Sequence, residues 1–487
     1  MKRNILHPSG VRLTRSRALL FTASLVAAVT VPSTGLAPGA SASATAGRHD
    51  HERSAVVASG QPANAVVAWN ANAGKASVAA CFIGGYGPQE ARMYAMMHIA
   101  IHDALNGIDR RSHPYAADLH ASGPTSARSA VATAAHDVLT PTLSSFSFFL
   151  PADCINAGIA SVEADYTAAL DDIPDGAAKT RGIALGQRAA AAILALRADD
   201  GYDTPTIDPA FQEGTEPGEY RYTPGSPFAF APHLGTDLRP FALKSGSQFR
   251  PRPPYDVTSP KYAADVNEIQ RLGGDGVTTP SDRTAEQTEI ALFWVESSPL
   301  LWSRIARTAA ISAELDMWQS ARLFALLNAA LTDGYVGTFE TKYHYLFWRP
   351  VTAIRLADTD GNPATTADPT WTPLLPTPAI PDYDSGHAVE GGAAAEVLKQ
   401  FFHTDAMDFS ICSFTLPAGQ TCADSSPTLR NFNSFSQAAR ENAVSRIYVG
   451  FHFRDAVITG TRHGRRIGLW TVNHILRPGS QGRALRR

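Results

Sequence analysis

Helical periodicity dominates this sequence. Within residues 89–108, Met93, Met97, Ile101 and Leu105 recur at four-residue steps, so they lie on one stripe of a helix. Further Ala-rich or amphipathic helical patterns cover residues 125–143, 157–170, 177–198, 284–296, 301–333, 388–402 and 429–474. Strand alternation is hard to find in these stretches. The pattern therefore predicts an all-α protein built from helical bundles.

A proline-rich interruption separates two groups of helices. Residues 201–260 contain many Pro and Gly residues, including the run Arg250-Pro-Arg-Pro-Pro254, which no regular helix accommodates. An ordered connection of this length is usually a functional covering or a link between domains. We therefore expect an N-terminal helical half with long loops at residues 47–260, a C-terminal helical half at residues 261–477, and a basic tail at residues 478–487.

The N-terminus has the layout of a secretory signal peptide. Residues 1–46 contain five Lys or Arg and no acid, then the apolar run 18–31, then small residues at 40–44. A membrane anchor is the alternative, but the apolar run is shorter than the ~20 residues that span a bilayer. We expect cleavage, secretion and a mature protein without a membrane anchor. A formal net charge of −3 also argues against a nucleic-acid partner.

The four cysteines suit an oxidising destination. Three pairings are possible, and we favour Cys412–Cys422 with Cys81–Cys154 because the first pair closes a short polar loop. A zinc site is disfavoured, since CxxC spacing is missing. His98 and His102 could also bind metal, but without an HExxH motif we expect packing or hydrogen bonding.

The first segment whose side chains could bind a ligand or act in catalysis runs from Lys342 to Pro350. Lys342 and Arg349 are seven residues apart, which is ~700° of turn on an α-helix, so both lie on one face if the helix persists. Pro350 is suited to begin a new helix.

The second segment is Asp384-Ser385-Gly386-His387, just before an Ala-rich stretch. Here the backbone N–H groups of a helix N-terminus point outward without partners. Ser385 or Asp384 could cap this helix, and we expect Asp384 to do so.

The third segment contains Arg446, Gly450, His452 and Asp455. Gly450 is a plausible helix stop. We expect His452 to stand at the start of the next helix, with Asp455 on the same face.

Together the three segments offer guanidinium, ammonium, hydroxyl, backbone N–H and imidazole groups. Arginine forks match tetrahedral oxyanions, and helix N-termini add positive potential. The segments therefore predict a site for phosphate or a phosphate mimic.

The order of these motifs resembles a known superfamily. Lys-x6-Arg-Pro, Ser-Gly-His and Ser-Arg-x5-His are similar to the signature of the vanadium-dependent haloperoxidases and type 2 phosphatidic acid phosphatases. The run Met96-Met97-His98-Ile-Ala-Ile-His102-Asp-Ala-Leu-Asn106 resembles the secreted bacterial haloperoxidase-like branch. The resemblance covers roughly residues 91–475, and it implies a helical haloperoxidase or phosphatase fold.

The resemblance also implies a role for each matching residue. His452 resembles the histidine that bonds to vanadium or attacks phosphorus, and His387 resembles the acid–base histidine. Lys342 could polarise bound peroxide, and Asp455 could orient His452. The groups that would hold the oxygens of vanadate are Lys342, Arg349, Ser385, the Gly386 N–H and Arg446.

Three positions depart from the signature. Ile380, five residues before Ser385, stands where well-known halide-oxidising relatives have an aromatic residue or His. Asp384 replaces the proline before Ser385, and Ala456 stands where the signature has an acid, with Asp455 one place early. A carboxylate beside an oxyanion repels it unless the carboxylate caps a helix or pairs with a cation.

Three functions fit this sequence. The first is a secreted vanadate-dependent haloperoxidase that uses hydrogen peroxide, a halide and an organic acceptor. The second is an acid phosphatase that forms a phosphohistidine at His452 and uses His387 to protonate the leaving group. The third is a non-catalytic helical protein that binds oxyanions.

Overall fold

The computed structural model describes residues 64–148 and 150–479, which lie within one compact unit. The signal peptide and most of the basic tail expected from the sequence lie outside the described residues. The main helices are α1 (Ala65–Ala79), α2 (Gly87–Ile108), α3 (Ala127–Ser144), α4 (Ala152–Asp171), α5 (Ala177–Leu196), α7 (Pro260–Leu272), α8 (Ala285–Phe293), α9 (Ser298–Ser312), α10 (Met317–Tyr345), α12 (Gly386–Phe402), α13 (Phe435–Tyr448) and α14 (Arg454–His474). Short helices are α6 (Leu234–Asp237) and α11 (Pro350–Arg355), with 3₁₀ turns at Ser145–Phe148, Gly246–Phe249 and Ala357–Thr359.

The prediction of an all-α fold is confirmed, with one small exception. In the described part of the chain, the strands are β1 (Ala406–Ile411) and β2 (Arg430–Ser434), which pair antiparallel with Phe409 opposite Phe432. The expectation of helix from residue 429 was therefore wrong at its start, because residues 430–434 complete this hairpin before α13 begins. Both favoured disulfides, Cys81–Cys154 and Cys412–Cys422, are present.

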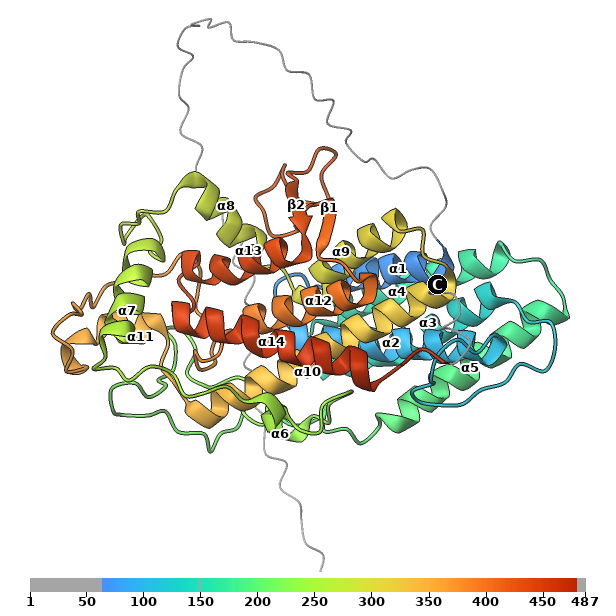
Figure 1. Ribbon diagram of the computed structural model, residues 1–487, viewed down its shortest axis with the longest axis horizontal. Coiled ribbons are helices and arrows are strands. Elements are labelled where there is room, and N and C mark those ends of the chain that lie inside the picture. Colours follow the sequence, from blue (N-terminus) through green and yellow to red (C-terminus); the bar gives the residue numbers. More distant parts are fainter. Residues whose placement is uncertain (1–63, 149, 480–487) are drawn as a thin grey trace, which may run out of the picture. The chain divides into compact units, whose positions relative to one another are not determined.

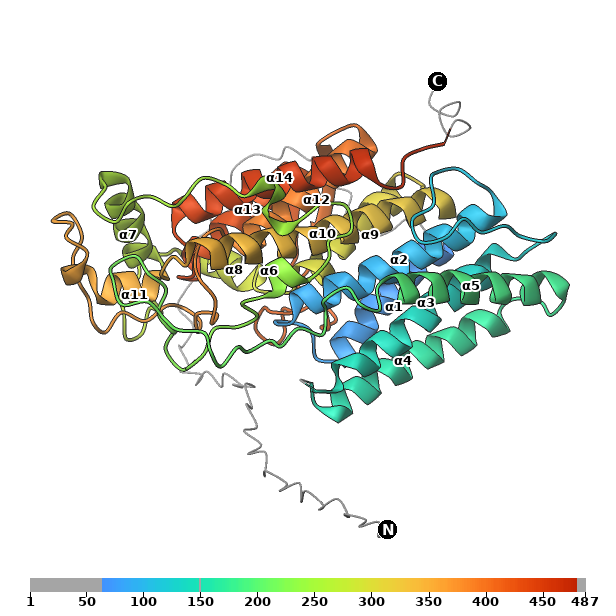
Figure 2. The same cartoon turned by 90° about the horizontal axis from the view of Figure 1, so that it is seen from below.

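Helix α10 is the central element (Figures 1 and 2). Its residues 323–342 are all buried, as expected for a helix that is apolar around most of its circumference. It packs against α2 on one side and α12 on the other, so it joins the helices of both halves. The division at residue 260 stays a prediction.

A turn separates α9 from α10, where the sequence suggested one continuous helical pattern. Glu314 adopts a positive φ of 50°, which ends α9. Asp316 then caps α10. Its side chain accepts a hydrogen bond from the Gln319 backbone N–H, and the Gln319 side chain accepts one from the Asp316 backbone N–H.

Glycines on α14 allow it to lie directly against α12. A Cβ atom at Gly464 would stand 1.8 Å from the Val389 carbonyl oxygen, and one at Gly460 would stand 2.7 Å from the Ser385 oxygen. Only glycine permits such close backbone approach. The Gly460-x3-Gly464 spacing thus fixes α14 beside the first turn of α12, where the second motif lies.

The proline-rich segment 201–260 forms an irregular strap along α10. The Asp333 carboxylate on α10 accepts hydrogen bonds from the backbone N–H groups of Phe241, Ala242 and Leu243 at 2.6–2.9 Å. Farther along, Tyr220 N donates to Leu346 O at 2.6 Å. The strap therefore also contacts the segment that contains Lys342 and Arg349.

Within the described residues, no helix combines the length and apolar character needed to cross a bilayer.

Candidate oxyanion site

Packing of α10, α12, α13 and α14 brings the three sequence motifs together. Lys342 lies in the last turn of α10, Ser385 caps α12 and Arg446 lies in the last turn of α13. His452 lies in the turn between α13 and α14, after Gly450 with its φ of 85°. A second hydrophobic cluster, which includes Trp348, packs beneath these segments.

Lys342 is fully enclosed. Its Nζ donates to the carbonyl oxygens of Pro381 at 3.0 Å and Asp382 at 2.8 Å. Burial and, second, the positive charge of Arg349 lower the pKa of Lys342 to about 7. An anion at this site would stabilise the ammonium form.

The sequence placed Lys342 and Arg349 on one helix face if the helix persists. In the structure the helix ends between them, so they do not share a helix. Helix α10 ends at Tyr345, Leu346 takes a positive φ of 49°, and Arg349 becomes the N-cap of α11 with Pro350 as its first residue. Tertiary packing brings the two side chains together instead. Arg349 Nε donates to Ile380 O at 2.6 Å, and Nη1 lies 3.1 Å from His452 Nε2.

Arg446 is the second buried guanidinium. Its Nη1 donates to Trp294 O at 3.1 Å, and its carbon lies 5.0 Å from the centre of the Phe451 ring. Burial lowers the pKa of Arg446 to about 9, against the opposing effect of Glu390. The positive charge of Arg349 also lowers the pKa of Arg446.

Asp382, not Asp455, orients His452. His452 Nδ1 lies 2.9 Å from Asp382 Oδ1, in a fully buried pair. Asp455 pairs with Arg252, and its backbone N–H donates to Asp265. The sequence expectation fails because α14 begins at Arg454, so His452 and Asp455 do not share a helix face.

Asp384 is turned away from the site. Its Oδ1 accepts from Thr338 Oγ1 at 2.8 Å, and its Oδ2 lies 2.9 Å from His463 Nδ1. Ser385 is the N-cap of α12, so the expectation that Asp384 caps this helix was wrong. The buried hydrogen-bonding partners on α10 and α14 attract this carboxylate more strongly than the helix end does.

His387 lies one turn before a buried acid that sequence reasoning missed. His387 Nδ1 is 3.7 Å from Glu390 Oε2. Burial, with Arg446 second, holds the pKa of His387 well below its usual range, whereas burial raises the pKa of Glu390 to about 7. The spacing of three residues on a helix is the signal that could have found Glu390.

Several buried polar atoms at this site lack a hydrogen-bond partner among the described residues. Arg349 Nη2, Ser385 Oγ, His387 Nε2 and Arg446 Nε are among them, as are the carboxylate oxygens Asp382 Oδ2 and Glu390 Oε2. Burial is the largest cause that lowers the pKa of His452, and the positive charges of Arg349, Lys342 and Arg446 lower it as well. The three cations therefore act on the same imidazole. Unpaired buried donors are costly unless a ligand satisfies them, and this set fits a tetrahedral oxyanion such as vanadate or phosphate.

The other histidines singled out in the sequence are engaged in packing and hydrogen bonds. His98 stacks on Phe324 and contacts Asn70, whereas His102 contacts Asp103 and Ser112. In residues 64–148 and 150–479, no group of three His, Cys, Asp or Glu side chains could hold a metal ion.

Comparisons with known proteins agree with this geometry. Residues 322–480 match the family model of the VCPO second helical-bundle domain. The vanadium chloroperoxidase of Curvularia inaequalis is 25% identical over 462 residues, which cover 75% of this chain and 74% of that protein. These matches support the vanadium haloperoxidase superfamily for this chain.

Solved structures support the same fold. A bacterial vanadium-dependent iodoperoxidase aligns with a TM-score of 0.67 at 23% identity, covering 85% of this chain and 98% of that one. An apo-type bacterial vanadium-dependent chloroperoxidase aligns with a TM-score of 0.60 at 16% identity, covering 78% and 92%. Membership of the vanadium haloperoxidase superfamily supports the assignment of this chain as an enzyme.

Proposed function

We propose that this chain is a secreted vanadate-dependent haloperoxidase that oxidises halide with hydrogen peroxide to hypohalous acid. The observation that carries the proposal is the set of buried polar atoms without partners on Arg349, Ser385, His387 and Arg446, together with His452, whose Nδ1 contacts Asp382. The superfamily relationship to vanadium haloperoxidases gives independent support.

The residues present fit vanadate. Lys342, Arg349, Ser385, the Gly386 N–H and Arg446 would hold its oxygens, and His452 would bond to vanadium. When bound, vanadate supplies a Lewis acid that activates hydrogen peroxide toward a halide nucleophile.

His452 is prepared to use its Nε2 lone pair. Asp382 accepts a hydrogen bond from the Nδ1–H group, which leaves the lone pair on Nε2, 3.1 Å from Arg349 Nη1. Burial and the surrounding cations hold the pKa of His452 well below its usual range, so the imidazole is neutral at neutral pH.

His387 is positioned to transfer protons, and Lys342 is positioned to donate a hydrogen bond. The buried His387 Nε2 is available to accept a proton from an oxygen of bound peroxide or to return one. Lys342, with its pKa near 7, can donate a hydrogen bond to an oxygen of the bound reactant and polarise it.

Secretion is part of the proposal. The basic, apolar and small-residue regions of the N-terminus support it, as do the disulfides in the mature chain. N-terminal sequencing of protein from the culture medium of an expressing bacterium should show cleavage near residues 42–46. Full-length protein retained in the cells would contradict this part.

The activity test compares wild type with His452→Ala after incubation with vanadate. Wild-type protein given hydrogen peroxide and bromide or iodide should halogenate a cyclic diketone probe, and the variant should not. Hydrolysis of an aryl phosphate, inhibited by vanadate and without halogenation, would select the phosphatase of the same superfamily. Absence of both activities with retained vanadate binding would leave the non-catalytic oxyanion-binding function.

A further inference from the structure

A second positively charged cavity lies between α1 and α9, outside the oxyanion site. Its volume is about 260 Å³, and Lys75, Arg304, Arg307, Leu300 and Phe414 are among the residues that line it. None of the described residues that line it is acidic.

Arg307 lacks a carboxylate partner in the part of the chain that the structure describes. Its Nη1 donates to Asn70 Oδ1 at 2.6 Å, and Asn70 in turn contacts His98. The Asn70 amide is uncharged. Burial lowers the pKa of His98 to about 3, so this histidine is neutral as well. Burial and, second, the positive charge of Arg304 lower the pKa of Arg307 to about 10. The guanidinium cation is therefore destabilised where it stands, as at Arg446 in the oxyanion site.

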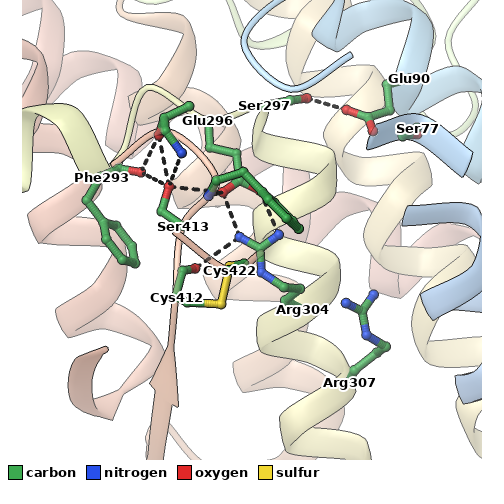
Figure 3. Close-up of polar contacts among 12 residues, drawn as sticks. Ser77, Glu90, Phe293, Glu296, Ser297, Arg304, Arg307, Cys412, Ser413 and Cys422 are labelled. Atoms are coloured by element: carbon green, nitrogen blue, oxygen red, sulfur yellow. Dashed lines mark hydrogen bonds and ion pairs between the residues drawn. A yellow bond between two sulfur atoms is a disulfide. The ribbon is translucent and has the colours of Figure 1, made fainter. Parts of the chain in front are cut away.

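The neighbouring cations are compensated. Arg304 is one turn before Arg307 on α9 and forms an ion pair with Glu296 at 2.7 Å, while also donating to Cys412 O. Figure 3 shows Arg304 between Glu296 and the Cys412–Cys422 loop, with Arg307 next to it on the same helix. Lys75 pairs with Asp165 at 3.0 Å. Arg307 thus leaves the cavity with one unbalanced positive charge.

The rest of the cavity wall is apolar. Leu300 and Val78 line it, and the Phe414 ring lies 5.2 Å from the Arg304 guanidinium carbon. A Cβ atom at Gly74 would lie 4.0 Å from Arg307 Nη1, so the absence of a side chain there leaves the guanidinium open to the cavity. A planar donor fork beside apolar walls suits a carboxylate with a hydrophobic body.

We infer that the cavity between α1 and α9 binds a small organic monocarboxylate, with its carboxylate on Arg307 and its apolar body against Leu300 and Phe414. This inference does not depend on the proposed haloperoxidase activity. It assigns a second anion site that differs from the first in ligand charge and in its hydrophobic walls.

Calorimetric titration of the full mature chain with benzoate tests the inference. Phosphate is kept saturating so that the oxyanion site is filled, and His452→Ala should leave benzoate binding unchanged. Arg307→Met should weaken benzoate binding about tenfold or more, since a charge-assisted pair is lost. Arg188→Met, which removes an exposed arginine of α5, is the matched control and should have no effect.

A second variant guards against misfolding of Arg307→Met. Val78→Phe would fill the cavity and leave every arginine in place, and it should also weaken benzoate binding. Neutral benzyl alcohol should bind far more weakly than benzoate. Absence of benzoate binding to wild type, or equal binding by wild type, Arg307→Met and Val78→Phe, would overturn the inference.

Discussion

Two histidine–aspartate pairs start from the same short loop and serve different purposes. Asp382 pairs with His452, and Asp384 pairs with His463, each with 2.9 Å between Nδ1 and the carboxylate. The first histidine presents Nε2 to Arg349 and the oxyanion site. The second is enclosed between α10 and α14, where a Cβ atom at Gly337 would stand 3.1 Å from its Nε2. We therefore expect the surroundings of the far nitrogen to decide whether such a pair acts on a ligand or stabilises the fold.

The charges around the two pairs differ as well. Burial raises the pKa of Asp382 to about 7, although Arg349 and Lys342 oppose this shift. Asp384 instead receives a hydroxyl hydrogen bond from Thr338 in addition to its histidine. We therefore expect ligand chemistry to depend on the first pair and folding stability to depend on the second.

The largest expected effect comes from His452→Ala. Turnover by the vanadate-loaded protein should fall by about a thousandfold or more, because in the proposed site the imidazole would bond directly to vanadium. Initial rates of halogenation measure this loss, and urea unfolding of the same variant should remain cooperative. A variant that keeps more than about a tenth of the rate would break the comparison.

Asp384→Ala should mainly affect stability. Removing this carboxylate leaves His463 Nδ1 without its buried partner and removes the 2.8 Å bond from Thr338 Oγ1, so the free energy of unfolding should fall by about 3–5 kcal/mol. Urea denaturation followed by circular dichroism measures the change. If the variant instead unfolds like wild type and loses turnover, Asp384 acts on the ligand and the distinction between the pairs is wrong.

Asp382→Asn should mainly affect the ligand. The variant keeps the shape of the side chain but removes the charge that orients His452, so vanadate affinity should fall about 10–100-fold. Calorimetric titration with vanadate measures the affinity. Asp384→Asn is the matched control, and an equal loss of affinity in both variants would contradict the proposed difference.

The smallest expected effect is the pH dependence of anion binding. Lys342, with its pKa of about 7, is protonated below that pH and loses its charge above it, while Asp382 gains negative charge over the same range. Sulfate keeps a constant charge across this range, so its affinity should decrease as the pH rises from 6 to 8.5, by about tenfold. Calorimetric titration with sulfate at pH 6 and at pH 8.5 measures the change. In Lys342→Met the affinity should depend less on pH. Constant or rising affinity would show that these groups do not face the anion.

Local sequence patterns predicted the helices well where a helix is amphipathic or begins with a clear signal. The stripe of residues 89–108 is α2, Pro350 begins α11 and Gly450 follows the end of α13. The patterns failed where long-range contacts decide the backbone. The turn at Leu346 and the β1–β2 hairpin depend on neighbours that are distant in the sequence.

The candidate site shows the same limit. Lys342, Arg349, His387, Arg446 and His452 were predicted as one site from motif order, and the structure brings them together. Asp382 and Glu390 were missed, because neither stands at a signature position and each acts through a contact that only packing creates.

The sequence by itself determined the helical class, the chemical inventory for an oxyanion and the favoured disulfide pairing, because these depend on residue type, order and short-range spacing. Only the tertiary structure decided which aspartate serves which histidine. Asp382 and Asp384 are two residues apart and chemically identical, so their partners depend on how α10, α12 and α14 pack around them. The close contact of Gly460 and Gly464 with the backbone of α12 determines where α14 lies, because a Cβ atom at either position would collide with α12.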